Sequence, residues 1–184
     1  MCIRDRIKAW ASGKTQPDVR VFVYPPEWEA LMLQRLRQFG EDCAAEQMPI
    51  EIVDVAQAFR TVVEERGAEP QLAALEKRAS SQLLANLRVL GTEAVEGVLR
   101  APLPDGVACR LLVNTGSLAT FVSYSAITNE HHGSTEAPPI PVVIAFPGEA
   151  DERSLNLLGL RPDTNYRVPR ILSLIHISEP TRPY

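Results

Sequence analysis

Three short loops hold the residues of this sequence whose types could do chemistry. "YPPE" (24–27), "NTGS" (114–117) and "FPGE" (146–149) each follow a β-branched, aromatic-rich run typical of a buried strand. If these strands are parallel, their carboxyl ends meet at one edge of a sheet, where α/β proteins bind ligands. We call this set the crest, and its residues are Tyr24, Glu27, Asn114, Thr115, Gly116, Ser117, Gly148, Glu149 and Arg153.

The crest admits two interpretations. Its polar groups could hold a small ligand, or its prolines and glycines could simply make the strand-to-helix turns. "SGKT" (12–15) resembles the end of a phosphate-binding loop, but Lys8 stands where that motif needs a glycine, and the segment precedes the first strand. No dinucleotide fingerprint and no G-x-S-x-G elbow follows any strand. The sequence therefore predicts no nucleotide cofactor.

The histidines and serines form no recognisable catalytic set. His131 and His132 are neighbours in a Gly/Ser/Pro-rich loop, with no further ligand type at metal-binding spacing. Ser117 and Ser154 have no base beside them in the sequence. The acids are scattered, so an acid/base pair stays an open alternative. We therefore expect no metal and no enzyme activity, with a small hydrolase or nucleotide binder as the alternative.

Hydrophobic periodicity predicts the elements that position the crest. Strands are expected within residues 18–26, 49–54, 107–114, 140–146 and 165–171, the last at a sheet edge because of Pro169. Amphipathic helices are expected after the first two strands and over 70–100. Within 70–100, Gly91-Thr92 predicts a break in the helix, and the leucine stripe is expected to be buried in the core. A short helix is expected before Gly159, and Trp28 and Leu31 are placed on a buried helix face.

Alternating strands and helices indicate right-handed crossovers and a mostly parallel sheet. The predicted fold class is α/β: one three-layer domain with a mostly parallel sheet of four to five strands, Rossmann-like without a dinucleotide or P-loop motif. The net charge of −4 and the lack of a Lys/Arg run disfavour direct nucleic-acid or anionic-membrane binding. Cys43 and Cys109 are typical of reduced core thiols, and no segment is apolar enough to span a bilayer. We expect a cytoplasmic protein.

The two ends of the sequence indicate a translated sequencing adapter. "MCIRD" is encoded by ATG-TGT-ATA-AGA-GAC, and the reverse complement of the same DNA encodes "LSLIH" near the other end. Residues 1–6 and 172–184 are therefore expected to be artefacts, which leaves one domain over residues 7–171.

The opening and closing blocks of this domain resemble the BrxB-type proteins of BREX (bacteriophage exclusion) defence systems. The family's opening strand ends in a turn like "YPPE" at 24–27, and its closing block is similar to "PVVIAFPGEADERSLNLLGLRPDTNYRVPRI" at 141–171. "LLVNTGSLATFVSYSAITNE" (111–130) is similar in placement to the family's strand-Gly-helix segment. The chain departs from the family pattern at Arg167, Glu149 and Ala150, which makes it a divergent member.

The resemblance implies a small accessory or regulatory component of a phage-defence complex, without catalytic residues. The implied partners are a PglZ-type phosphatase-like protein and a large ATPase. Because arginine is enriched at protein interfaces, Arg153, Arg167 and Arg170 are the expected polar anchors on a partner.

Overall fold

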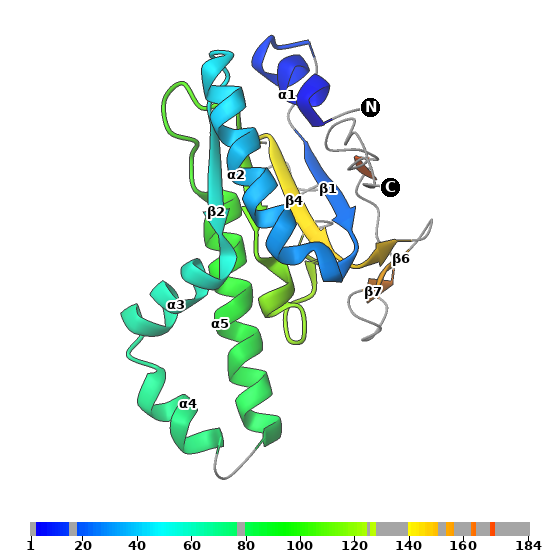
Figure 1. The fold of residues 1–184 in the computed structure, drawn as a ribbon. Coiled ribbons are helices and arrows are strands. Elements are labelled where there is room, and N and C mark those ends of the chain that lie inside the picture. The colour runs from blue at the N-terminus through cyan, green and yellow to red at the C-terminus, as the bar shows by residue number, and fades with distance from the viewer. Residues whose placement is uncertain are drawn as a thin grey trace.

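The computed structural model describes residues 3–14, 18–76, 80–124, 126–127, 140–150, 154–156, 163–164 and 170–171. Its centre is an all-parallel sheet of five strands in the order β2-β3-β4-β1-β8 (Figure 1). The predicted α/β fold class is therefore confirmed, with β8 at the expected edge. The strands are β1 (Val19–Tyr24), β2 (Ile50–Asp54), β3 (Cys109–Val113), β4 (Val142–Pro147) and β8 (Arg170–Ile171).

Helices cover both faces of this sheet, which makes the three layers (Figure 1). α1 and α2 pack on one face, and α3 and α5 pack on the other. Each parallel connection must cross over the sheet, so the helices between strands are placed where they bury its faces. The helical elements are α1 (Ile3–Ala11), η1 (Pro26–Trp28), α2 (Glu29–Ala45), α3 (Val55–Glu65), α4 (Glu69–Glu76), α5 (Ser80–Arg100) and η2 (Thr115–Leu118).

The side-chain alternation of the strands divides the core into two clusters. In β1, Phe22 and Tyr24 pack with the α1 and α2 residues, whereas Val21 faces the α5 side and is fully buried. Successive strand residues point to opposite faces, so one apolar strand supplies both clusters. Among the described residues, no helix is long and apolar enough to cross a membrane.

Gly91 does not break the long helix, and the expectation of a break at Gly91-Thr92 is wrong. α5 continues through it to Arg100. A Cβ built on Gly91 would lie 2.6 Å from Cγ2 of Val122 and 2.8 Å from Cε2 of Phe121. The glycine is therefore explained by the close approach of the helix to the segment after η2.

Two further expectations about secondary structure and burial are wrong. Residues 154–156 form strand β6 (Ser154–Asn156), not a helix, because they pair antiparallel with β5 (Glu149–Ala150) and β7 (Asp163–Thr164). Strand pairing with these neighbours overrides the helical pattern. Trp28 and Leu31 are 44% and 47% exposed, because the buried side of α2 begins at Met32.

α4 and the first half of α5 extend beyond the carboxyl edge of the sheet (Figure 1). We call residues 69–90 the arm. No described residue from 56 to 90 is buried, and the arm's leucines are at best half-buried. The expectation that the leucine stripe is core is therefore wrong for the arm and holds only beyond Gly91, where Ala94, Val95 and Leu99 are buried.

α1 includes part of the segment that is expected to be adapter-derived. Within it, Arg6 forms an ion pair with Asp18 at 2.6 Å, and its guanidinium lies over the ring of Trp10 at 5.3 Å from the centroid. Ile7 and Trp10, which lie in the expected domain, are buried in the α2-side cluster. The adapter origin of residues 1–6 stays a prediction, and residues 172–184 lie outside the described residues.

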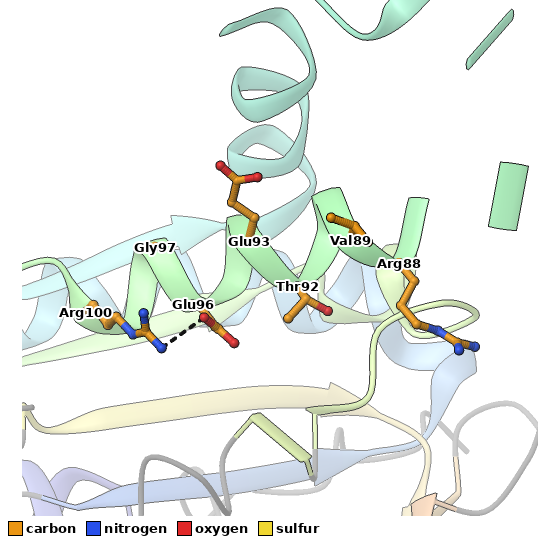
Figure 2. Close-up of a pocket in the computed structure, with 7 residues that line it drawn as sticks. All are labelled: Arg88, Val89, Thr92, Glu93, Glu96, Gly97 and Arg100. Carbon is orange, nitrogen blue, oxygen red and sulfur yellow. Dashed lines mark ion pairs between the residues drawn. The ribbon is translucent and has the colours of Figure 1, made fainter. Parts of the chain in front are cut away.

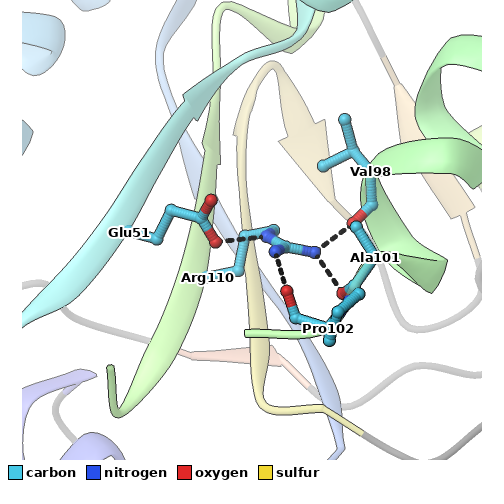
Figure 3. Close-up of polar contacts among 5 residues, drawn as sticks. All are labelled: Glu51, Val98, Ala101, Pro102 and Arg110. Atoms are coloured by element: carbon cyan, nitrogen blue, oxygen red, sulfur yellow. Dashed lines mark hydrogen bonds and ion pairs between the residues drawn. The ribbon is translucent and has the colours of Figure 1, made fainter. Parts of the chain in front are cut away.

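Arg110, the second residue of the apolar strand β3, is a buried cation that connects α5 to the sheet (Figure 3). Its guanidinium donates to a carboxylate oxygen of Glu51 on β2 at 2.7 Å. It also donates to the backbone carbonyls at the end of α5, those of Val98, Ala101 (2.9 Å) and Pro102 (3.0 Å). The last carbonyls of a helix lack intrahelical donors, so Arg110 serves as a C-terminal cap.

The stability of the domain is expected to fall in alkaline solution because of Cys109. Burial, with a smaller contribution from Cys43, raises the pKa of the Cys109 thiol to about 12. The folded state thus holds this proton more tightly than the unfolded state. The contribution of Cys109 to stability is therefore complete below the pKa of the thiol in the unfolded chain, and it is lost as the pH rises toward 12. Measured by urea denaturation, the free energy of unfolding of Cys109→Ala should decline less steeply above pH 9 than that of the parent chain. An equal slope would contradict this assignment.

Candidate functional site

The structure places the three crest loops at one edge of the sheet. β4 lies between β1 and β3, and Tyr24 is the register partner of Pro147. The backbone N–H of Gly148 donates to the carbonyl of Tyr24 at 2.8 Å. A Cβ on Gly116 would lie 2.8 Å from Cγ of Pro147, so the "NTGS" and "FPGE" loops are in close contact.

Two buried polar side chains of the crest, those of Thr115 and Tyr24, serve the fold. The Thr115 hydroxyl donates to the carbonyl of Ala145 at 2.6 Å, and the Thr115 carbonyl accepts from Tyr124. The Tyr24 hydroxyl donates to a carboxylate oxygen of Glu29 at 2.5 Å. Burial, followed by this hydrogen bond, raises the pKa of Tyr24 well above its ordinary value. Neither hydroxyl is therefore placed to act as a nucleophile or base.

Asn114 and Asp54 form the polar centre of the crest. Asn114 has φ 59°, a left-handed conformation that asparagine tolerates better than most residues. Its side-chain amide donates to both carboxylate oxygens of Asp54, at 3.3 and 3.4 Å. Asp54 is the last residue of β2, and its carboxylate accepts from the N–H groups of Ala56 and Gln57 as the N-cap of α3. Sequence reasoning missed Asp54, although an aspartate between a strand and a helix is an N-cap signal.

The remaining crest residues differ in exposure. Glu27, Ser117 and Glu149 are exposed, and Gly148 is buried. The Ser117 hydroxyl donates to the carbonyl of Asn114 at 2.7 Å, which closes the turn. Arg153 and Arg167, together with the histidine pair, lie outside the described residues, as does the side chain of Arg170.

The electrostatics of the crest do not suit a phosphate group. Helix N-termini attract anions, but at this edge the protein's own carboxylates lie at the N-termini of α2 and α3. Asp54 caps α3, and Glu27 and Glu29 lie in the first turns of η1 and α2. A phosphate at these positions would meet negative charge, which disfavours the nucleotide-binding alternative.

A hollow in the described surface lies along α5, between Arg88 and Arg100 (Figure 2). All of its lining residues come from this one helix. Its charged groups are already paired: Arg100 with Glu96 at 3.0 Å, and Glu93 with Arg66 of the α3 C-cap at 2.5 Å. A groove with one wall and balanced charges does not enclose a small molecule.

Within the part of the chain that the structure describes, no three His, Cys, Asp or Glu residues are grouped to hold a metal ion. The crest thus consists of hydrogen-bonded turns with an acidic, exposed rim. Comparisons with models of protein families, with curated proteins and with solved structures find no match to this chain.

Proposed function

We propose that the chain is a non-enzymatic accessory or regulatory component of a BREX-type anti-phage defence complex and acts by binding other proteins. The partners that the resemblance implies are the PglZ-type phosphatase-like protein and the large ATPase of such a system. The structural observation that carries the proposal is the state of the crest, where the polar groups of Tyr24, Asn114, Thr115 and Ser117 are engaged in bonds within the protein. Because these hydroxyl and amide groups are engaged within the protein, none of the four is free to act in catalysis, which supports a binding role.

The exposed rim of the crest supplies the contacts for a partner. Glu27 and Glu149 stand on neighbouring loops at the ends of β1 and β4, and both are exposed. Exposed carboxylates set the orientation and rate of association more than the affinity. We therefore assign the partner surface to this edge.

Co-expression with the PglZ-type protein and the ATPase tests the proposal. The tagged chain should retain at least one of them, and Glu27→Arg/Glu149→Arg should reduce that retention about tenfold or more. Asp105→Arg/Glu41→Arg makes the same change in charge at exposed positions outside the crest and should leave retention unchanged. Retention of neither protein would refute the proposal.

A ligand screen tests the alternative of a nucleotide binder or small hydrolase. Thermal unfolding is measured with ATP, GTP, NAD and Mg²⁺, each in large excess. A ligand at a hundred times its dissociation constant stabilises the folded state by about 2.7 kcal/mol. We expect no such shift; a clear shift with any nucleotide, abolished by Asn114→Ala, would establish the alternative instead.

A further inference from the structure

Trp28 and Leu31 form an exposed apolar pair at the start of α2. Trp28 is the N-cap of this helix and Leu31 lies three residues further on, so the two residues share one side of its first turn. Both side chains are nearly half exposed. Single exposed apolar residues are common, but a neighbouring pair that includes a tryptophan has the composition of an interface anchor.

The backbone that carries the pair is fixed to the sheet. The Tyr24 hydroxyl, at the end of β1, donates to a carboxylate oxygen of Glu29 in the first turn of α2 at 2.5 Å. Between them, the N–H of Trp28 donates to the Pro25 carbonyl at 3.0 Å and closes the η1 turn. A partner that binds the pair therefore does not have to order this turn, which lowers the entropic cost of association.

The charge around Trp28 is negative. Glu27 precedes it and is exposed, and Glu29 follows it. The nearest basic residue along α2 is Arg35, about two helical turns from Trp28. The helix dipole of α2 contributes about half a positive charge at this end, which is less than the two carboxylates carry. Among the described groups of this turn, the balance therefore attracts a cation.

We propose that Trp28 and Leu31 receive an arginine-bearing segment of the protein partner, an inference that rests on the proposed function. In this complex the guanidinium lies over the indole of Trp28 and pairs with the carboxylate of Glu27, and an apolar side chain of the same segment covers Leu31. Arginine suits both contacts, because its planar guanidinium stacks on aromatic rings and also donates to carboxylates. The exposed carboxylate of Glu149, on the neighbouring loop, adds to the negative field that orients the segment.

A second copy of the chain is a poorer occupant of this surface. In a two-fold symmetric contact both copies bring the same patch, so the apolar centre would consist of two pairs of Trp28 and Leu31 only. Stable interfaces bury roughly 1,600 Å² in total, with about 20–30 residues on each side. A different protein can supply the remaining contacts from its own surface.

Affinity measurements with the purified partner test the inference. The partner is whichever of the PglZ-type protein and the ATPase the parent chain retains on co-expression. Trp28→Ser and Leu31→Ser should each weaken its binding about tenfold or more, as truncation of interface anchors does. Serine is a favoured N-cap residue, so Trp28→Ser should preserve the start of α2, which circular dichroism checks. Val89→Ser is the matched control, because Val89 is 64% exposed on α5, across the sheet from α2, and should leave binding unchanged.

Two further substitutions of Trp28 test the cation. Trp28→Phe keeps an aromatic face, whereas Trp28→Leu keeps only an apolar side chain. Binding of the partner should therefore be about threefold weaker for Trp28→Leu than for Trp28→Phe. Equal affinities of the two variants would overturn the assignment of an arginine to this position.

The outcomes separate this inference from the proposed function. If Glu27→Arg/Glu149→Arg weakens binding of the partner but Trp28→Ser does not, the proposed function stands and the inference is overturned. If the purified chain alone is a dimer that Trp28→Ser dissociates, a second copy covers the pair, and the inference is again overturned. If the parent chain retains neither protein, the proposed function and the inference are both refuted.

Discussion

Arg110→Met should lower the free energy of unfolding by about 3 kcal/mol. The substitution removes the donor for three helix-end carbonyls and the partner of Glu51, whose side chain is 30% exposed. Removing one partner of a buried ion pair costs about 3–5 kcal/mol, and the partial exposure of Glu51 puts this case at the lower end. The free energy of unfolding of Arg110→Lys should lie between those of the parent chain and of Arg110→Met, because an ammonium group keeps the charge but cannot reproduce the planar fork of donors.

Urea denaturation measures this loss, and a neighbouring arginine provides the control. Arg100 lies on the last turn of α5 and pairs with Glu96, but its side chain is 62% exposed. Exposed pairs of this kind contribute about 0.5 kcal/mol or less, so Arg100→Met should leave the denaturation midpoint almost unchanged. If Arg110→Met and Arg100→Met had equal midpoints, Arg110 would not cap α5.

Gly91→Leu and Gly97→Leu should change stability in opposite directions, although both glycines lie in α5. A side chain at Gly91 collides with Phe121 and Val122, and overpacking of this kind costs about 3 kcal/mol. At Gly97 a Cβ meets nothing within 4 Å, so the better helix former should stabilise the protein by up to about 1 kcal/mol.

Thermal and urea unfolding of the two variants, compared with the parent chain, distinguish these effects. The circular dichroism spectra should show that both variants keep the helix. Stabilisation by leucine at both positions would mean that α5 does not approach the segment after η2 as closely as described.

The parallel sheet could be predicted from the sequence because its strands are short runs of buried residues bounded by proline, glycine or asparagine. "VRVFVY" is buried on both faces in the structure, and only a strand covered by helices on both sides has this pattern. Parallel strand direction alone places the three loops at one edge of the sheet, whereas their contact depends on the strand order, in which β4 lies between β3 and β1. The side-chain bonds that satisfy Thr115 and Tyr24 could not be predicted, because they depend on the register between distant strands.

The errors share a physical cause: a local signal has two meanings that only long-range contacts distinguish. Glycine is a residue type typical of helix ends, but Gly91 lies where the helix closely approaches residues 121 and 122. The sequence of Ser154–Asn156 fits a helical pattern, but these residues form a strand because they pair with β5 and β7. Arg110 is an arginine in an apolar strand, and its role depends on a helix end that the sequence separates from it by a loop.

Because α5 continues through Gly91, one uninterrupted helix has a buried half and an exposed half. Backbone amides of the buried half, from Val95 to Leu99, should be protected until the whole domain opens, whereas those near Leu84 can exchange with solvent through local opening of the exposed half. A protease would therefore cut within the exposed half of α5 before it cuts the sheet. The boundary between these two regimes lies near Gly91, the first buried residue of α5 among those described.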